Sequence, residues 1–450
     1  MVKLNDIIKV ECIDLNHEGN GVCIHENFAI FVKGLLIGEV CECKITKVEK
    51  NFAKAIISKM IKTSKSRCLP ICANFEHCGG CNLLHLTYDK QLEFKKNMVE
   101  QTLKRIGKVD IKVKEIIGAE NPYYYRNKVQ IPFGVSKNRA ICGFYKQKTH
   151  DIIPLESCYI QPVVITEIAR YIKNVCNDLR IPAYDEKTKK GSIRHVLVRK
   201  TTNPNASLDE YMVVLISKTE KVPALVQLVQ KIVTKYDCVK SVILNVNNNP
   251  NNIILGDNYH LLYGKEVLIE TLCGLKFEMS HKSFFQTNHE QTEKLYAKAM
   301  EYLDASSEDI ILDSYCGVGT MALIASKNVK KVYGIEIVED AIKDAKKNAK
   351  LNNITNCEFI CGKSEEEVFN IKDVTRVIVD PPRKGLDIKM IEALNKMNVE
   401  RLVYVSCDCA TLARDINLLK ETYEVKEVTA VDMFPNTCHV ETVVLMSMLK

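Results

Sequence analysis

The first part of the chain alternates short apolar runs with polar residues, as half-buried β-strands do. The runs IIKVECIDL, FAIFVKG, EVCECKITKV and FAKAIISKMI are separated by turns that carry glycines. Strands of this length with glycine turns between them are typical of a small antiparallel barrel. The pattern therefore predicts a small β-barrel over residues 1–61.

The pattern changes after the barrel. From Tyr88 to Ile106 apolar residues recur with helical spacing, and from about residue 122 strand-like and helix-like segments alternate. We therefore expect residues 62–280 to hold a cysteine cluster and a central α/β domain. From residue 281 the order helix, strand, glycine turn, helix, strand predicts a doubly wound parallel sheet over residues 281–450.

A glycine turn in this last domain indicates a cofactor site. The strand in ILDSYCGVGT is followed by Gly317 and Gly319 and then by a helix, a place where a ligand can approach the backbone. Glu336 ends the next strand, where a carboxylate can bind ribose hydroxyls. The turn lacks the third glycine of a dinucleotide site, which favours S-adenosylmethionine, with a nicotinamide cofactor as the alternative. We take RVIVD as the third strand; it ends at Asp380 and is followed by two prolines and Arg383.

The strand RLVYVS leads directly into Cys407, at the same expected edge of the sheet. A thiolate that adds to C6 of a pyrimidine makes C5 nucleophilic enough to accept a methyl group. A base must then remove the C5 proton. A hairpin that ends the sheet would bring Glu441 back over the crevice, with His439 two residues before it. A buried structural cysteine and a solvated glutamate are the alternative interpretations.

The composition adds a metal site and a nucleic-acid partner to this picture. The chain has nineteen cysteines, and Cys68, Cys72, Cys78 and Cys81 are closely spaced around a glycine pair. Four thiolates suit either zinc or an iron–sulphur cluster. The formal charge of +7 and basic runs such as KTKKGSIRHVLVRK favour a phosphate backbone. The apolar runs are too short to span a bilayer and no secretory pattern is evident, so we expect a cytoplasmic protein without a membrane partner.

Several segments together resemble one family. They are NHEGNGVCIHENFAIFVKGLLIGE, CANFEHCGGC, YYRNKVQIP, SFFQTN, LDSYCGVGT, VDPPRKGL, YVSCDCATLARD and FPNTCHVE. With them the chain resembles the RNA (uracil-5-)-methyltransferases, and in particular the 23S ribosomal RNA branch with a TRAM barrel and an iron–sulphur cluster. The resemblance covers essentially the whole chain. It implies an OB-like TRAM barrel, a central α/β domain and a Rossmann-like S-adenosylmethionine-dependent methyltransferase domain.

The resemblance also assigns roles to residues. It implies that Cys407 is the nucleophile and Glu441 the base, and that the methyl donor contacts Gln286, Tyr315, Glu336 and Asp380. It implies a [4Fe–4S] cluster bound by Cys72, Cys78, Cys81 and Cys158, with Cys68 as a spare. The family commonly has Asn-Pro after the nucleophile, whereas this chain has Asp408 and Cys409, which leaves open which thiol reacts.

The expected activity is methylation of C5 of a uridine in 23S ribosomal RNA by a monomeric enzyme. An RNA cytosine-C5 methyltransferase, a transfer-RNA uridine-C5 methyltransferase and a non-catalytic RNA-binding protein are the alternatives. The transfer-RNA alternative is disfavoured because such enzymes of this family generally lack the barrel and the cluster. Side chains expected to hold the base or the phosphates of the RNA are Phe284, Phe285, Phe434, Arg126, Lys128, Arg194 and Arg199.

Overall fold

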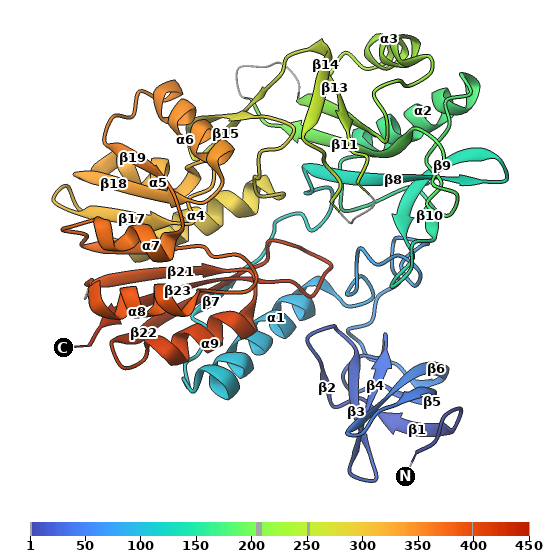
Figure 1. Cartoon of the computed structure of the whole chain (residues 1–450). Helices are drawn as coiled ribbons and strands as arrows, with labels where there is room; N and C mark the ends of the chain where they lie inside the picture. Colours follow the sequence, from blue (N-terminus) through green and yellow to red (C-terminus); the bar gives the residue numbers. More distant parts are fainter. Residues whose placement is uncertain (1, 204–208, 250–252, 398, 450) are drawn as a thin grey trace.

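The chain folds into a barrel and two α/β parts that face each other (Figure 1). The computed structural model describes residues 2–203, 209–249, 253–397 and 399–449. The barrel carries the N-terminus, and the C-terminus lies at the outer side of the C-terminal sheet (Figure 1). Among the helices of these residues, none combines the length and the apolar character needed to cross a membrane.

The N-terminal strands form one six-stranded sheet in the order β1-β5-β6-β4-β3-β2. The barrel strands are β1 (Ile7–Glu11), β2 (Asp14–Leu15), β3 (Gly21–His25), β4 (Phe28–Lys33), β5 (Val40–Val48) and β6 (Phe52–Lys62). Neighbours pair antiparallel except for β4 and β6, which are parallel. Alternate residues such as Cys23, Ile30 and Ile45 are fully buried in its core, so the predicted barrel is confirmed.

The central part is a seven-stranded sheet in the order β10-β9-β8-β11-β12-β13-β14. Its elements are β8 (Lys128–Ser136), β9 (Arg139–Tyr145), β10 (Ile152–Pro154), α2 (Val163–Asp178), β11 (Ile193–Thr201), β12 (Glu210–Ser217), α3 (Leu225–Lys235), β13 (Val239–Val246) and β14 (Asn258–Gly264). Helices α2 and α3 bury Ile168, Ile172 and Leu228 against one face of this sheet. On the other face, Leu197 and Met212 pack against Leu268 of a short hairpin, described below, that connects to the C-terminal part.

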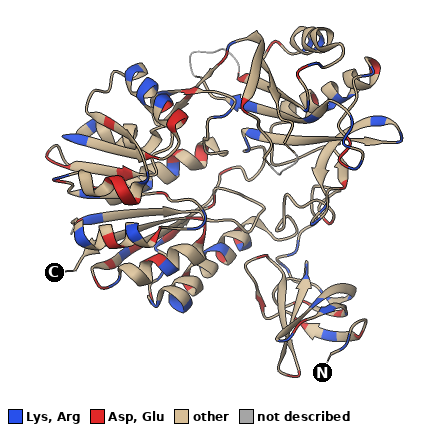
Figure 2. Ribbon diagram, in the orientation of Figure 1, with Lys and Arg blue, Asp and Glu red and all other residues tan. Residues whose placement is uncertain are grey.

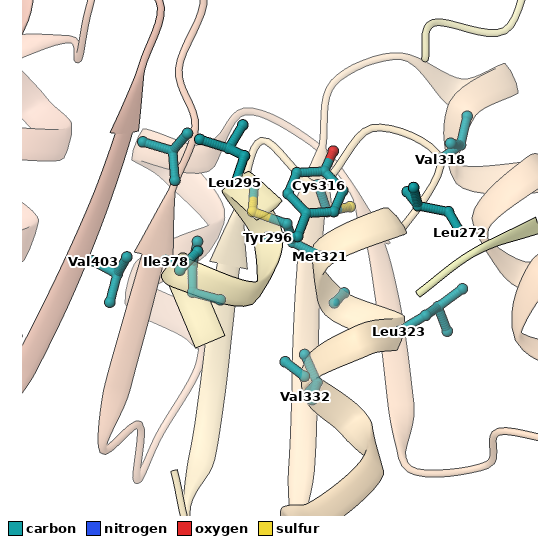
Figure 3. Close-up of a cluster of buried hydrophobic side chains, with 14 of the residues drawn as sticks. Leu272, Leu295, Tyr296, Cys316, Val318, Met321, Leu323, Val332, Ile378 and Val403 are labelled. Carbon is teal, nitrogen blue, oxygen red and sulfur yellow. The ribbon is translucent and has the colours of Figure 1, made fainter. Parts of the chain in front are cut away.

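The C-terminal part is an eight-stranded sheet in the order β19-β18-β17-β20-β21-β23-β22-β7. The first five of these strands run parallel, and β23 pairs antiparallel with both β21 and β22. The elements are α4 (His289–Leu303), β17 (Ile310–Ser314), α5 (Thr320–Ala325), β18 (Lys331–Glu336), α6 (Glu339–Leu351), β19 (Cys357–Cys361), α7 (Ser364–Glu367), β20 (Arg376–Val379), α8 (Ile388–Met397), β21 (Arg401–Ser406), α9 (Cys409–Leu419), β22 (Tyr423–Val431) and β23 (Glu441–Met448). Figure 3 shows part of the core on one face, with Leu295, Met321 and Ile378 drawn together.

This sheet confirms the doubly wound arrangement but contains two strands that sequence analysis did not find. Strand β19 lies at one edge and precedes RVIVD in the chain, so RVIVD is the fourth strand and not the third. Strand β7 (Glu115–Ile117) lies at the other edge and pairs parallel with β22. Each is five residues or shorter, and such segments have little periodicity of their own.

The division between the domains also differs from the expected one. Helix α1 (Tyr88–Thr102), its π-helical last turn η1 (Leu103–Gly107) and β7 belong to the C-terminal sheet, although they lie within residues 62–280. The reason is that Val99 and Leu103 are fully buried in the core that α9 covers. The hairpin of β15 (Leu268–Leu272) and β16 (Leu275–Met279) likewise buries Phe277 in the core beside α4.

Candidate active site

The six residues expected to bind the methyl donor or to react line one large cleft. The cleft has a volume of about 1750 Å³ and lies where β17, β18, β20 and β21 end, facing the central domain. Ligands of open α/β sheets bind at this carboxyl edge. The six side chains are Gln286, Tyr315, Glu336, Asp380, Cys407 and Glu441.

The turn after β17 exposes backbone to the cleft. Gly317 has a φ of 55°, and a Cβ placed on it would meet nothing within 4 Å. Its amide donates a hydrogen bond of 3.2 Å to Oε2 of Glu336, whose Oε1 accepts one of 2.9 Å from the Val338 amide. Glu336 is therefore fixed in orientation beside a backbone that a ligand can approach closely.

Two further carboxylates lie near this turn. Asp380 directly follows β20, and desolvation in the cleft raises its pKa to about 7. Asp313, near the end of β17, is fully buried, and neither of its carboxylate oxygens has a hydrogen-bond partner among the described residues. Burial and the nearby charge of Asp380 raise the pKa of Asp313 well above its usual range. Unpaired buried carboxyl groups of this kind are a mark of ligand sites.

Cys407 occupies the turn between β21 and α9. The hydroxyl of Ser406 accepts from the Asp408 amide at 3.1 Å, and Asp408 caps α9 by accepting from the amides of Ala410 and Thr411 at 2.9 and 3.0 Å. These bonds hold the turn so that Cys407 lines the cleft. Burial and the neighbouring carboxylates raise the pKa of its thiol to about 11, and the positive charge of Arg383 opposes this rise.

Cys409 is placed differently. It is the first residue of α9 and packs against the core on the other face of the sheet. Its sulphur lies 3.9 Å from the hydroxyl of Thr442, and burial raises the pKa of the thiol to about 12. Cys409 is absent from the residues that line the cleft, so the geometry favours Cys407 as the reactive thiol.

Glu441 is brought to Cys407 by strand pairing. Strand β23 runs antiparallel to β21 with Thr442 opposite Ser406, so the residues next to this pair adjoin at the edge of the sheet. Burial, with a smaller contribution from Asp380, raises the pKa of Glu441 to about 8. His439 also lines the cleft, and burial lowers the pKa of its imidazole. Both are placed as the expected terminal hairpin requires.

The cysteines surround a second, smaller cavity. Cys72, Cys78, Cys81 and Cys158 line a space of about 280 Å³. Burial and the charges of the other three raise the pKa of Cys81, and burial raises that of Cys158 to about 11. Cys68 points elsewhere, since its thiol donates to the Leu84 carbonyl at 3.4 Å. Within the described ranges, no three His, Cys, Asp or Glu side chains lie close enough to hold a single metal ion.

The residues expected to hold RNA divide into two groups. Phe284, Phe285 and Phe434 line the cleft, and Phe284 is 74% exposed, which is unusual for a large apolar side chain. Arg126 lines both cavities. Lys128 borders this region, and burial with two nearby arginines lowers its pKa to about 7.

Arg194 and Arg199, by contrast, are buried and donate to backbone carbonyls, which does not favour the expectation that they bind phosphates. Arg194 donates to the carbonyls of Asn247 and Asn249 at 2.8 Å each. Arg199 is 2% exposed and donates to the Ser283 carbonyl at 2.5 Å. Both lie on β11, whose residues are buried on both faces. Lys and Arg occur in all three parts of the chain and do not gather in one of them (Figure 2).

Sequence analysis did not name several residues of the cleft, Tyr296 and His281 among them. Tyr296, on α4, lines it and shares a hydrogen bond of 3.2 Å with the hydroxyl of Thr320; its ring lies beside Met321 (Figure 3). His281 lines it too, and its Nε2 is buried without a partner among the described residues. No motif in the sequence distinguishes either residue from ordinary core or loop positions.

Comparisons with known proteins agree with this architecture. The model of the TRAM domain matches residues 3–57, and that of the tRNA (Uracil-5-)-methyltransferase family matches residues 263–449. The chain is 44% identical to an uncharacterized RNA methyltransferase of Clostridium acetobutylicum, over 99% of this chain and 97% of that protein. It is 43% identical to one from Staphylococcus aureus, over 99% and 98%.

A solved structure is similar over nearly the same extent. It is a tRNA (uracil-54, C5)-methyltransferase of Pyrococcus abyssi in complex with S-adenosyl-L-homocysteine, with 27% identity and a TM-score of 0.78. The match covers 98% of this chain and 100% of that one. A transfer-RNA enzyme thus matches across the barrel as well, so the barrel alone does not distinguish a ribosomal from a transfer-RNA substrate. With these matches added to the cleft described above, the chain belongs to the RNA (uracil-5-)-methyltransferase family.

Proposed function

We propose that the protein transfers a methyl group from S-adenosylmethionine to C5 of a uridine in 23S ribosomal RNA. The observation that carries this proposal is the meeting of Cys407 and Glu441 in one cleft with Glu336 and Asp380. A nucleophilic thiol and a base at adjoining strand ends are the two groups that C5 methylation of a pyrimidine requires. Because one chain supplies all four, the site needs no second subunit.

The proposed reaction has three steps: addition of the Cys407 sulphur to C6, methyl transfer to C5, and removal of the C5 proton by Glu441. The sulphur of Cys407 forms a bond to C6, and the electrons of the C5–C6 double bond move towards the C4 carbonyl, which makes C5 nucleophilic. C5 then forms a bond to the methyl carbon of the donor while the bond from that carbon to the sulphonium sulphur breaks; the sulphur keeps the electron pair and S-adenosylhomocysteine is the neutral leaving group. The carboxylate of Glu441 takes the proton from C5, the double bond forms again, and the bond between C6 and the sulphur breaks to release the thiolate.

The turn after β17 and the ends of β18 and β20 fit the methyl donor. In this proposal Glu336 binds the ribose hydroxyls, while Tyr315, Asp380 and Gln286 contact the rest of the molecule. When bound, S-adenosylmethionine supplies a methyl group on a positively charged sulphonium. A positive charge beside Asp380 and Cys407 lowers the pKa of both groups. The thiol, which has a pKa of about 11 in the free protein, would then ionise more readily.

The four cysteines around the small cavity fit an iron–sulphur cluster. We propose that Cys72, Cys78, Cys81 and Cys158 bind a [4Fe–4S] cluster. All four line a cavity of about 280 Å³, a space larger than one metal ion fills. Several buried thiolates near each other need a positively charged group between them. The role in this proposal is structural, since the cavity is separate from the reacting thiol.

A transfer-RNA uridine is a second candidate substrate. It is favoured by the similarity to the Pyrococcus abyssi enzyme, which is named for uracil 54 of transfer RNA. The cysteine site and its resemblance to the ribosomal branch support 23S ribosomal RNA. Both candidates use the same cleft and the same chemistry, so only the RNA distinguishes them.

The test uses purified protein, labelled S-adenosylmethionine and two unmodified transcripts, 23S ribosomal RNA and a bulk transfer RNA. We expect 5-methyluridine in the ribosomal transcript by nucleoside mass spectrometry. Cys407→Ala should abolish it, and Cys409→Ala should not. If only the transfer RNA is methylated, transfer RNA and not 23S ribosomal RNA is the substrate. If the product is 5-methylcytidine, the enzyme methylates cytosine and not uracil. Methylation by Cys407→Ala would overturn the mechanism.

A further inference from the structure

The loop that joins β22 to β23, residues 432–440, carries three side chains that line the cleft. They are Phe434, Thr437 and His439, and the loop leads directly into Glu441. The loop extends toward α1 and away from its own sheet (Figure 1). Its conformation is therefore set by the groups that it meets outside the sheet, and it leads into Glu441, whose backbone begins β23.

Asn436, in the middle of this loop, is held at every polar atom. It adopts a φ of 67°, in the left-handed region that a non-glycine residue occupies only when the surroundings fix it. The side-chain oxygen of Gln91, on α1, accepts from the Asn436 amide at 2.9 Å, and the Gln91 nitrogen donates to Oδ1 of Asn436 at 3.2 Å. Nδ2 of Asn436 donates to the Pro122 carbonyl at 2.7 Å.

The remaining contacts come from the residues that follow the cysteine motif. The amides of Asn82 and Leu83 both donate to the Asn436 carbonyl at 3.1 Å. Oδ1 of Asn82 accepts from the Cys438 amide at 2.8 Å. Asn82 directly follows Cys81, which lines the cysteine cavity. Its side chain thus holds the loop on the side nearest to His439 and Glu441.

We propose that Asn82 is a positioning residue for the proton-abstraction step. The inference rests on the proposed function, because it assumes that Glu441 takes the C5 proton. Without the acceptor oxygen of Asn82, the Cys438 amide loses its partner, and the chain just before Glu441 loses the side-chain bond that holds it nearest to the base. The bond from Cys407 to C6 still forms and the methyl group still transfers. Removal of the proton then slows, so the methylated RNA stays attached to the sulphur.

The experiment measures turnover and covalent adduct together, with the RNA that wild type methylates. For Asn82→Ala we expect turnover to fall by about tenfold or more, the effect of an ångström-scale misplacement of a reacting group. The protein–RNA band on a denaturing gel should rise severalfold, as it should for Glu441→Gln. The KM for the methyl donor should stay within about twofold of wild type. Asn82→Asp keeps the acceptor oxygen and should restore both turnover and adduct to wild-type behaviour.

The matched control is Asn177→Ala. Asn177 also bonds backbone through both ends of its amide, accepting from the Ala140 amide at 2.8 Å and donating to its carbonyl at 3.0 Å, but it lies in the central domain. It should show neither effect. Wild-type turnover in Asn82→Ala, or lower turnover without adduct, would overturn the inference. If Asn82→Ala does not fold, Asn82→Gln, which displaces the oxygen by one methylene, should show the same rise in adduct; no rise there also overturns it.

One further reaction, analysed on the same denaturing gel, distinguishes a failure of this inference from a failure of the proposed function. Wild type with 5-fluorouridine-substituted RNA should form a stable adduct, because fluorine at C5 cannot leave as a proton. Absence of that adduct would refute the proposed function itself. Its presence, together with an adduct-free Asn82→Ala reaction on ordinary RNA, would refute only the role of Asn82.

Discussion

Replacing Lys95 should destabilise the C-terminal domain far more than replacing a surface lysine. Lys95 lies on α1, and Asp432 is the first residue of the loop 432–440 between β22 and β23. Their side chains are both 0% exposed and form an ion pair. Nζ of Lys95 also donates to the Phe434 carbonyl at 3.0 Å, and Oδ2 of Asp432 accepts from the Tyr88 hydroxyl at 2.8 Å. Lys95→Met removes the positive charge and leaves Asp432 buried with the tyrosine alone.

The magnitude follows from the cost of an unpaired buried charge. Breaking a buried pair by removing one partner costs about 3–5 kcal/mol, and the bond from Tyr88 that remains places the expected loss near the lower value. At roughly 2–4 °C per kcal/mol for a domain of this size, the unfolding midpoint should fall by about 6–12 °C. The matched control is Lys104→Met, since the pair of Lys104 with Asp110 is 59% and 72% exposed. An exposed pair contributes about 0–1 kcal/mol, so the control midpoint should move by at most a few degrees.

The assay is thermal unfolding followed by circular dichroism, with the double variant Lys95→Met/Asp432→Asn alongside. The double variant carries no buried charge and should regain much of the lost stability. If Lys95→Met shifts the midpoint no more than Lys104→Met does, or if the double variant is less stable than the single one, the ion pair does not stabilise the C-terminal domain as argued.

Four further predictions concern the cleft and the cysteine cavity. Burial raises the pKa of Glu441 to about 8, so this carboxyl is protonated at pH 6.5 and must ionise to act as a base. The methylation rate should therefore rise by up to about tenfold per pH unit between pH 6 and 8; a flat profile over this range would exclude the role. The same raised pKa makes the folded protein lose stability as pH rises through about 8, because the buried carboxyl then becomes charged. Glu441→Gln should therefore have a higher unfolding temperature than wild type at pH 9 and the same unfolding temperature at pH 5. Phe284→Ala should raise the KM for RNA severalfold with little change in that for the methyl donor, if its exposed ring stacks on a base. Cys158→Ser should lose bound iron while Cys68→Ser keeps it, as measured by metal analysis of the purified proteins.

The placement of Cys407 and Glu441 could be predicted because strand direction alone decides it. A residue that follows a parallel strand lies at the carboxyl edge of the sheet, and a terminal antiparallel hairpin brings its last strand back to the same edge. The gathering of Cys158 with three cysteines far from it in the chain rested on resemblance, because nothing local to LESCYIQ indicates a partner. The ambiguity between Cys407 and Cys409 needed the structure, since only the start of α9 shows which face each thiol takes.

Other features could not be predicted, for physical reasons. Strand β7 exists because β22 offers an unpaired edge, a non-local cause that three residues do not encode. Arg194 and Arg199 belong to a basic run whose composition predicts an exposed segment, yet both donate hydrogen bonds to backbone carbonyls inside the molecule. The bonds from Asn82 and Gln91 to the loop at Asn436 join segments more than three hundred residues apart, so no sequence pattern announces them.

The central claim is that the sulphur of Cys407 bonds to C6 of a uracil during the reaction. The most direct measurement is to incubate the protein with S-adenosylmethionine and 5-fluorouridine-substituted RNA, digest the trapped complex and identify the modified peptide by mass spectrometry. The claim predicts a fluorinated, methylated nucleotide attached to the peptide at Cys407. An adduct at Cys409, or no adduct while ordinary RNA is still methylated, would contradict it.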